Sequence, residues 1–482
     1  MALHDQPSQI KVAIIGTGLA GLTTAHLLHN DAARRFHVTL FEQAETLAFD
    51  GASVAVRDDE TGLVERLDLP MRACAGGYYA NLLRMYNYLG IPLHPVRFLF
   101  VFARALSCCS ELSEALTPQQ AGSVTGSYFI HASNLHQTPP PRPTTRHPLA
   151  YVAETLFLII CYCWFTAACF FVPPLAISHN TQTGGETVAQ YLDRIWLPQR
   201  YVSHYLLPLM SSVATCSHND FLAFPASDLI NYKKLSHGQQ HYTVCGGVQQ
   251  VQSKLAKGLR DIRLASRVLS LQATNGCVLV RYMSRRASHS QPILEECLFD
   301  RVVLAVSPDV AASLFRPLAA VLGQFPTKRV ESSVLSPKSH VFTVVQANEK
   351  AATHCMHHNS NVSPAQVITL RTSLSKHEST TEALHALPSG LLVQTCPLSP
   401  NQDSACLLQT AKFTRTLRTP QSKAATLSIV QGAASGDEGA WTNGQDNVWL
   451  AGSWCWDGMV LLEGCVISAM RVARDCGVEI PW

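Results

Sequence analysis

The sequence is poor in charged residues. Aspartate, glutamate, lysine and arginine make up 15% of its 482 residues, and 37 basic against 34 acidic side chains leave a net charge of +3. No stripe of basic residues occurs, which argues against a nucleic-acid partner. The first ten residues, MALHDQPSQI, are polar, so we expect no cleavable signal peptide. The 47% of hydrophobic residues can fill a large core, enough for two intertwined domains.

Pairs of cysteines at zinc-binding spacing are also lacking. The 16 cysteines are scattered through apolar segments, as at Cys161, Cys163 and Cys169, and no CxxC pair occurs. We therefore expect buried, reduced thiols in a cytoplasmic protein rather than a disulfide framework. The HCMHH run, His354 to His358, lies in a polar stretch, and we expect no metal site there.

The clearest motif is a glycine loop near the N-terminus. In KVAIIGTGLAGLTTAHLLHNDAARRFHVTLFEQ, an apolar strand runs into Gly16, Gly18 and Gly21, then a helix, then a second strand that ends at Glu42. The first glycine allows a tight turn, the second lets a pyrophosphate approach the backbone, and the third lets helix and strand pack closely. A carboxylate about 20 residues beyond the loop accepts hydrogen bonds from ribose hydroxyls. This context predicts a dinucleotide site of the Rossmann type, with phosphates at the helix N-terminus.

The rest of the chain indicates an α/β protein. FDRVVLAVSP, residues 299–308, is a nearly continuous apolar strand, as in a sheet buried on both faces, and the end of the chain predicts strand, turn and helix. Residues 184–216 have the spacing of amphipathic helices, which we expect to be broken at Pro198 and at Pro208. We find no internal repeat.

One long apolar segment needs separate treatment. Residues 155–178 carry no formal charge, and Pro173 and Pro174 limit the predicted helix to Thr155–Val172. That helix would be about 27 Å long, just enough to span a bilayer. A single crossing, however, would put the N-terminal strands and the C-terminal unit on opposite sides. If both belong to one sheet, the segment is either a buried helix or a monotopic patch in one leaflet, which would give the protein peripheral membrane contact.

Three separated segments together resemble a known group. The N-terminal unit, GGVQQVQSKLAKGLRDIRLASRVLSL in the middle and LAGSWCWDGMVLLEGCVISAMRVA at the end resemble the flavin-binding domain of the amine oxidase and phytoene desaturase superfamily, closest to fungal and bacterial FAD/NAD(P)-binding proteins. The resemblance implies FAD as cofactor. It implies a Rossmann-like FAD-binding domain assembled from residues 8–95, 238–310 and 440–482, and an α+β substrate domain from 96–237 and 311–439.

The resemblance also implies which residues hold the flavin. Besides the glycine loop, with Leu19 and Ala20, the superfamily places a strand residue near the adenine and a C-terminal motif at the pyrophosphate and ring. The residues expected at the cofactor are Gly16, Gly18, Leu19, Ala20, Gly21, Glu42, Ser53, Arg72, Val268, Gly452, Ser453, Leu462 and Glu463. Arg72 falls where the chain should pass the flavin, and it either stabilises negative charge on the reduced ring or pairs with a neighbouring carboxylate.

The sequence departs from the superfamily pattern in two places. LAFDGASVAV stands where a GGR motif is usual, and Val460, Leu461 and Leu462 stand where amine oxidases tend to carry an aromatic wall of the substrate cage. Trp454 and Trp456 lie close by, and they either face the flavin or pack in the core. With Arg72 they are the catalytic candidates, while no essential acid or base is identified. Lys338 lies roughly where amine oxidases carry a water-positioning lysine, and Tyr78 and Tyr79 are either pocket residues or part of a helix start.

The expected activity follows from these features. We expect an FAD-dependent oxidase or dehydrogenase that passes a hydride from an apolar small molecule to the flavin, in secondary metabolism. A redox-neutral flavin isomerase and a flavin monooxygenase are the alternatives. The sequence contains one GxGxxG loop, which argues against a monooxygenase with a second nucleotide domain. The sequence does not set the substrate, the electron acceptor or the oligomeric state.

Overall fold

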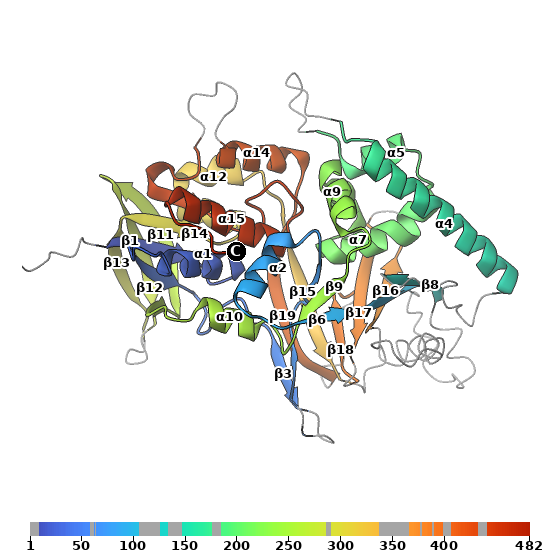
Figure 1. The fold of residues 1–482 in the computed structure, drawn as a ribbon, viewed down its shortest axis with the longest axis horizontal. Coiled ribbons are helices and arrows are strands. Elements are labelled where there is room, and N and C mark those ends of the chain that lie inside the picture. The colour runs from blue at the N-terminus through green and yellow to red at the C-terminus, as the bar shows by residue number, and fades with distance from the viewer. Residues whose placement is uncertain are drawn as a thin grey trace, which may run out of the picture.

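The structure is a computed structural model. It describes residues 9–57, 62, 64–105, 126–133, 147–175, 185–285, 291–336, 366–375, 378–387, 390–398, 406–431 and 441–482. Two halves are visible in Figure 1, one around a parallel sheet and one around a larger mixed sheet with helices on one side.

The first half is organised by a five-stranded parallel sheet. Its strands come from both ends and the middle of the chain, in the order β10 (Asp261–Arg263), β2 (Phe36–Phe41), β1 (Ile10–Ile15), β14 (Arg301–Leu304) and β20 (Val448–Leu450). Every neighbouring pair is parallel, so the carboxyl ends of all five strands lie at one edge. The α/β class and the strands predicted at both ends of the chain are confirmed.

The sheet is buried on both faces, as the apolar strand sequences predicted. Along β1, Val12 and Ile14 belong to one core cluster and Ala13 and Ile15 to another, because successive side chains point to opposite faces. The first cluster includes residues of α1 (Leu19–His29) and α15 (Leu462–Asp475), which pack on each other. The second includes residues of a three-stranded antiparallel sheet, made of β11 (Ser266–Thr274), β12 (Cys277–Ser284) and β13 (Ile293–Phe299).

A seven-stranded mixed sheet organises the second half. Its strand order is β19 (Leu407–Thr416), β15 (Thr327–Leu335), β18 (Leu392–Thr395), β17 (Thr380–Ala386), β16 (Gln366–Ser373), β7 (Phe98–Arg104) and β8 (Ser127–Ser133). Helices cover one side of this sheet in Figure 1. They are α4 (Pro148–Phe171), α5 (Val188–Arg194), α6 (Gln199–Tyr201), α7 (Leu207–Ala214), α8 (His218–Leu222) and α9 (Ala226–Ser236).

Smaller elements connect the halves. Two short sheets complete the strands. One pairs β3 (Val54–Arg57) with β4 (Val64–Leu67), and in the other β9 (His241–Val244) lies between β5 (Ala73–Ala75) and β6 (Leu93–Val96). The remaining helices are α2 (Ala80–Tyr88), α10 (Gln249–Leu255), α11 (Pro308–Leu314), α12 (Ala319–Leu322) and α14 (Pro420–Gln431).

The two main sheets follow the expected division of the chain. All five parallel strands lie within 8–95, 238–310 and 440–482, and all seven strands of the mixed sheet lie within 96–237 and 311–439. Helices are shared less cleanly, because Ala311 and Leu314 of α11, Leu322 of α12 and Ile429 of α14 belong to the core cluster beneath the parallel sheet. The domain boundaries stay a prediction, and the packing of these helices brings parts of 311–439 to the first domain.

Pro208 does not break its helix, contrary to our expectation. The chain is helical without interruption from Gln199 to Ala214, and a π-helical turn at Val202–Leu206 comes directly before α7. The wider turn accommodates a residue that lacks the N–H of an ordinary helical bond. Pro198 does mark a boundary, because it is the N-cap of α6.

The long apolar segment is a helix, as predicted, and α4 extends it to 24 residues. It is long and apolar enough to cross a membrane, the only such helix among the described residues, yet just 28% of its most apolar window is buried. The buried-helix interpretation therefore fits one face alone, formed by residues such as Leu158, Cys161 and Phe165. The opposite face is exposed and apolar.

We expect that α4 does not cross a membrane. The strands β1 and β2 precede α4 in the chain, and β14 and β20 follow it, yet all four pair in one sheet. A single crossing would place the strands before α4 and those after it on opposite sides of the membrane, so they could not pair. Reporter tags fused to the two ends of the chain should therefore be equally sensitive to protease added to sealed vesicles. Protection of one tag and cleavage of the other would contradict the observed sheet.

Candidate functional site: a glycine loop at the sheet edge

The glycine loop has the geometry that its sequence predicted. Gly16 follows β1 with a φ of 101°, and a Cβ there would lie 2.6 Å from the carbonyl oxygen of Ala305. A Cβ on Gly21 would lie 2.0 Å from the carbonyl oxygen of Gly16, so these two glycines allow close packing. Gly18 differs, because a Cβ there would meet nothing within 4 Å. Its missing side chain leaves open space at the start of α1, as a bound pyrophosphate requires.

The N-terminus of α1 is free to bind an anion. Gly18 is its N-cap, no side chain caps it, and its first turn carries no acidic residue. Leu19 and Ala20 are buried, and the Ala20 backbone already has a hydrogen bond to Cys465, so their contact with a ligand stays a prediction. Unpaired N–H groups and the positive end of the helix dipole suit phosphate groups.

Glu42 lies at the end of β2 beside the loop, where the ribose contact was predicted. Its Oε2 accepts hydrogen bonds from the backbone N–H of Thr17 at 3.1 Å and from the Thr17 hydroxyl at 2.6 Å. Its Oε1 accepts one from the N–H of Ala44 at 3.0 Å. A carboxylate offers about four acceptor positions, so one remains for a ribose hydroxyl. Glu42 thus also holds the loop on the sheet.

Ser53 and Arg72 both interact with Asp68. The Ser53 hydroxyl donates to Asp68 at 3.4 Å, and Asp68 also accepts from the backbone N–H of Val248 at 3.1 Å. Burial raises the pKa of Asp68, and the charge of Arg72 is among the effects that oppose the rise. Asp68 therefore links Ser53, from the segment that replaces the GGR motif, to the cation Arg72, which lies further along the chain.

Arg72 is the best evidence that an anionic cofactor fits. Arg72 is partly buried, its central guanidinium carbon lies 4.3 Å from the centre of the Phe49 ring, and its buried Nη1 has no hydrogen-bond partner among the described residues. Burial lowers the pKa of Arg72, and Asp68 counters this in part. A buried cation with an unmade hydrogen bond is costly. A phosphate or a negatively charged flavin ring would supply the missing acceptor.

Glu463 is held by protein groups. Its Oε1 accepts from the N–H and the side-chain amide of Asn81, at 2.9 and 2.7 Å, and its Oε2 accepts from the N–H of Leu82 at 3.0 Å. The carboxylate therefore caps α2 and fastens it to the start of α15. Contact of Glu463 and its neighbour Leu462 with the flavin stays a prediction.

The loop after β20 lies at the same sheet edge as the glycine loop. Gly452 lies two residues after the end of β20, and its N–H donates to the Ser468 hydroxyl of α15 at 2.9 Å. Ser453 comes next and is half-buried. A Cβ on Gly464 would lie 2.4 Å from both the Ser453 carbonyl oxygen and the Trp456 ring, so glycine is required for this loop to pack on α15. The two loops come from opposite ends of the chain.

Val268 lies on β11 near the predicted ribose contact. The N–H of Ser266, at the start of β11, donates to the carbonyl oxygen of Glu42 at 2.8 Å. The Val268 side chain is buried in the core cluster that includes Phe41. Its contact with an adenine stays a prediction.

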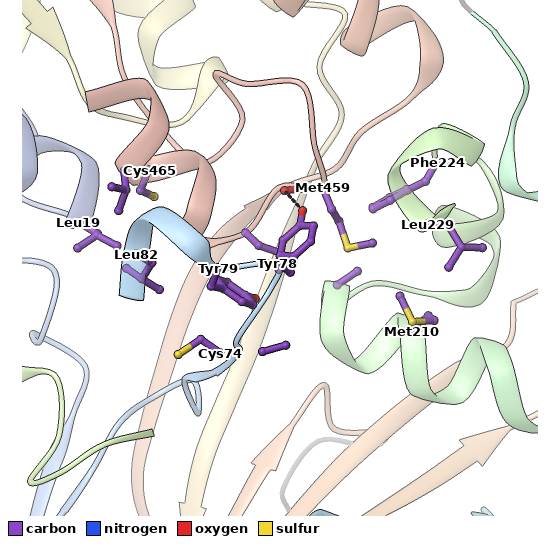
Figure 2. Close-up of a cluster of buried hydrophobic side chains, with 14 of the residues drawn as sticks. Leu19, Cys74, Tyr78, Tyr79, Leu82, Met210, Phe224, Leu229, Met459 and Cys465 are labelled. Carbon is purple, nitrogen blue, oxygen red and sulfur yellow. Dashed lines mark hydrogen bonds between the residues drawn. The ribbon is translucent and has the colours of Figure 1, made fainter. Parts of the chain in front are cut away.

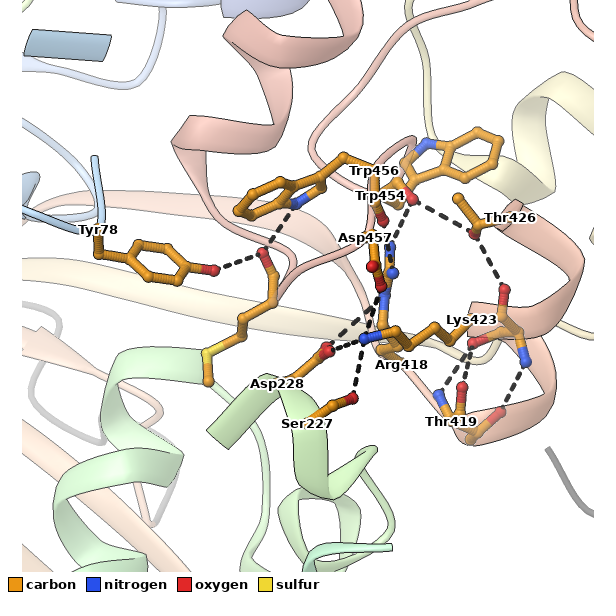
Figure 3. Close-up of polar contacts among 12 residues, drawn as sticks. Tyr78, Ser227, Asp228, Arg418, Thr419, Lys423, Thr426, Trp454, Trp456 and Asp457 are labelled. Carbon is orange, nitrogen blue, oxygen red and sulfur yellow. Dashed lines mark hydrogen bonds and ion pairs between the residues drawn. The ribbon is translucent and has the colours of Figure 1, made fainter. Parts of the chain in front are cut away.

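The two tryptophans have different surroundings. Trp454 is buried, its Nε1 donates to the carbonyl oxygen of Val306 at 3.1 Å, and its ring meets that of Phe325 at 5.1 Å, so it packs in the core. Trp456 is partly buried and lies edge-to-face with Tyr78 at 5.8 Å. Figure 3 shows Trp456 and Tyr78 on the same side of this loop, both bonded to the Met459 carbonyl oxygen, at 3.1 and 3.3 Å.

Sequence reasoning missed a buried polar cluster that holds this loop. Arg418 is almost fully buried and donates to the carbonyl oxygens of Trp456 and Trp454 at 2.7 and 2.5 Å (Figure 3). Lys423 of α14 bridges Asp228 of α9, at 2.8 Å, and Asp457 of the loop, at 2.7 Å. Asp228 is 195 positions from Lys423, and Trp456 is 38 from Arg418, so no local signal could reveal the cluster.

Tyr78 and Tyr79 lie in an apolar layer between the halves. Figure 2 shows them beside Met459 on one side, with Met210, Phe224 and Leu229 of the second half facing them. Burial raises the pKa of Tyr78 and Tyr79 well above the ordinary value, and it raises the pKa of nearby Cys74 to about 12. These groups are therefore uncharged at neutral pH.

Two expected positions cannot be compared with the structure. Lys338 and the run His354 to His358 lie outside the described residues. Among the residues that are described, no group of three or more histidine, cysteine or acidic side chains could hold a metal ion.

Comparisons with known proteins agree with this geometry. Residues 14–89 match the family of NAD(P)-binding Rossmann-like domains, and residues 198–347 match the family of flavin containing amine oxidoreductases. The sequence matches no curated protein.

Solved structures show the same fold along nearly the whole chain. Cyclohexylamine oxidase from Brevibacterium oxydans is 13% identical, with a TM-score of 0.52, over 98% of this chain and 100% of that one. A putative protoporphyrinogen oxidase from Exiguobacterium is 14% identical, with a TM-score of 0.52, over 97% and 99%. The fatty acid isomerase from P. acnes that produces CLA is 10% identical, with a TM-score of 0.55, over 96% and 98%.

We expect Gly18→Val to fold and to lose the flavin. The site has room for a Cβ, and a φ of −66° at Gly18 suits any residue, but the side chain would occupy the pyrophosphate position. Flavin affinity, measured by titration of the apoprotein, should fall by at least about a hundredfold. Glu42→Ala should lower it about tenfold, because one ribose contact is lost. Gly21→Val is the comparison that should fail to fold, and full flavin absorbance in Gly18→Val would refute the placement.

We expect Arg72→Met to have opposite effects on stability and on binding. Removing a buried cation with an unmade hydrogen bond should stabilise the apoprotein by about 1 kcal/mol or more in thermal unfolding. The same change should weaken FAD binding at least about tenfold, because a charged partner of the cofactor is lost. Arg316→Met, at an exposed position, is the matched control. Equal FAD affinity in Arg72→Met and the control would show that Arg72 does not face the cofactor.

The loop geometry and the unsatisfied Nη1 of Arg72 fit a dinucleotide, and the match of residues 198–347 to the flavin containing amine oxidoreductases supports FAD as that dinucleotide.

Proposed function

We propose that this FAD-dependent oxidoreductase oxidises an apolar, uncharged small molecule in secondary metabolism, with transfer of a hydride from a substrate C–H bond. FAD, when bound, supplies the hydride acceptor. The residues of the chain would orient the substrate, exclude water and keep the surroundings of the reacting bond uncharged.

The observation that carries this proposal is the apolar layer around Tyr78 and Met459. The side chains that face it from the second half are Met210, Phe224 and Leu229 (Figure 2). Methionines in such a layer can adapt to substrates of irregular shape. A substrate held between these halves would therefore meet hydrocarbon, sulfur and aromatic rings, which favours a long hydrocarbon or polycyclic body.

The ionisable groups nearest this layer are neutral or already paired. Burial keeps the phenols of Tyr78 and Tyr79 protonated, and it raises the pKa of Tyr232 to about 12. Asp228 and Asp457 are both bonded to Lys423. Hydride loss from an uncharged carbon needs no strong base, whereas abstraction of a proton does. This uncharged environment therefore suits hydride loss better than it suits proton abstraction.

Rigid support of the loop next to this layer also favours the proposal. Arg418 binds two carbonyl oxygens of the loop, and Glu463 fastens α2 to α15. Both contacts fix parts of the chain that would border the reacting atoms. Such fixed positions contribute by holding substrate and acceptor in a productive orientation.

Isomerisation is the second candidate, because the fold is shared with a fatty acid isomerase as well as with oxidases. A neutral, apolar site serves either reaction. The two differ in whether the substrate leaves oxidised. A monooxygenase is less well supported, since the sequence offers one dinucleotide loop, and we assign that loop to FAD.

A cytoplasmic location is part of the proposal. All 13 cysteines in the described residues are free thiols, and several of them are buried, as expected in a reducing compartment.

We expect an apolar substrate, and not NADPH, to reduce the flavin. Candidate metabolites mixed anaerobically with the holoenzyme should bleach the flavin absorbance, whereas NADPH alone should leave it unchanged. Rapid bleaching by NADPH would replace the oxidase with a monooxygenase or reductase. Conversion of substrate without net bleaching and without oxygen uptake would establish the isomerase.

The rate of that bleaching should be nearly independent of pH between about 6 and 9, because no group near the apolar layer is expected to titrate there. A substrate without ionisable groups provides the clean measurement. A steep rise through one pKa in that range would reveal a catalytic base that this proposal lacks.

A further inference from the structure

The exposed face of α4 is a continuous apolar stripe. Large side chains recur on it at helical spacing and remain uncovered, with exposed fractions of 84% for Phe171, 75% for Leu149 and 68% for Ile160. Val152, Leu156 and Trp164 extend the stripe between them, each more than half exposed. Exposed residues of this size are common singly on soluble proteins, but seldom as a continuous row over a helix of this length. Figure 1 shows α4 along the outer edge of the second half, beyond α9.

The stripe carries no charge. Glu154 is the one acidic or basic residue of α4, and its side chain is 10% exposed. Its carboxylate is bonded to Arg200 and to the Tyr205 hydroxyl, so it is neutralised on the inner side. Lys233 lies over the Tyr162 ring at 4.1 Å and donates to its hydroxyl at 2.9 Å.

One tryptophan, Trp196, extends the stripe beyond the helix, next to Trp164. The Trp164 Nε1 donates to the carbonyl oxygen of Ile195 at 2.8 Å, so its ring lies against the turn between α5 and α6. That turn presents Trp196, which is 87% exposed. Trp196 also has a φ of 55°, a left-handed conformation that is unfavourable for a bulky residue. A strained backbone that holds an uncovered aromatic ring suggests a binding role outside the folded chain.

A lipid surface matches these features better than a protein does. Protein interfaces are fixed in register by hydrogen bonds, roughly one per 100–200 Å², and by a polar rim. The six residues of the stripe offer no hydroxyl, amide or charge for this purpose, apart from the Trp164 indole, which is already bonded. Hydrocarbon needs no such partners. Tryptophan is moreover the residue that concentrates where hydrocarbon meets lipid headgroups.

We propose that α4 lies flat in one leaflet of a bilayer, with its stripe and Trp196 inserted to about 5–10 Å. The common sheet formed by strands before and after α4 rules out a crossing, so the contact is monotopic. Because the stripe is neutral, insertion depends on apolar area and not on anionic lipid. This inference is independent of the proposed oxidation chemistry.

Vesicle flotation tests this surface. The holoenzyme should float with neutral phosphatidylcholine vesicles, and about 0.5 M salt should not release it, since screening weakens only contacts between charges. Ile160→Glu combined with Phe171→Glu should lower the partition coefficient at least about tenfold. The matched control is Leu294→Glu with Leu298→Glu on β13, where exposed fractions of 61% and 58% are similar but the position is at the far end of the molecule (Figure 1). Flavin absorbance, recorded for every variant, separates loss of lipid binding from loss of the cofactor site.

Three results would overturn the proposal. One is failure of the wild-type holoenzyme to float with neutral vesicles. Another is binding that requires anionic lipid and disappears in salt. The last is a lipid-free dimer that the α4 double variant converts to a monomer, without any vesicle binding, which would assign the stripe to a second copy of this chain.

Trp196 provides a second test in which folding and binding move in opposite directions. Trp196→Gly removes the left-handed strain, so the thermal midpoint should stay the same or rise. Its vesicle partitioning should fall severalfold, and the blue shift of tryptophan fluorescence on vesicle addition should shrink. Unchanged partitioning and an unchanged shift would exclude Trp196 from the bilayer contact.

Discussion

The pairing of β1 with β14 is the constraint on which the rest of the structure depends. It joins Val12 to Arg301 in register, and β14 in turn pairs with β20 near the end of the chain. Closing the long loop between β1 and β14 costs conformational entropy. Burial of the sheet on both faces offsets that cost. Once these strands are paired, the glycine loop and the loop after β20 must meet at one edge, and the intervening chain must form the second half.

The charged groups near that edge show how the candidate cofactor site is held in place. Glu42 and Glu463 are satisfied by backbone N–H groups and short side chains, and Arg418 is satisfied by carbonyl oxygens. Each of these contacts fixes a loop or a helix start in place. Arg72 is the exception, because its buried Nη1 has no partner in the described residues. An anionic cofactor completes the hydrogen bonding that the protein alone leaves unfinished, so cofactor binding and stability of the folded chain should be linked.

The two faces of α4 relate the same architecture to its surroundings. Its inner face contributes Tyr151, Leu158 and Phe165 to the main core, and its outer face adds nothing to that core. A helix that is apolar all round suits a position between protein and lipid. An apolar substrate would itself partition into a bilayer. A contact between α4 and the membrane would then bring the second half close to the phase where such a substrate concentrates.

The sequence by itself determined the parts that depend on local pattern. Spaced glycines after an apolar strand, an acid at the end of the next strand and a glycine-bearing helix start at the C-terminus identify a dinucleotide fold without any long-range information. An uncharged apolar run ended by two prolines likewise predicted the helix α4, though not which face is exposed, because an all-apolar helix has no polar side to mark the solvent. The break predicted at Pro208 was wrong, because a π-helical turn accommodates the missing N–H of the proline and the helix continues. Only the tertiary structure decided that Glu463 caps α2, that Trp454 packs in the core, and that Arg418, Asp228 and Lys423 meet. Each of these contacts joins residues distant in the chain, and their energies come from burial and hydrogen bonding that exist only after the sheet has brought the segments together.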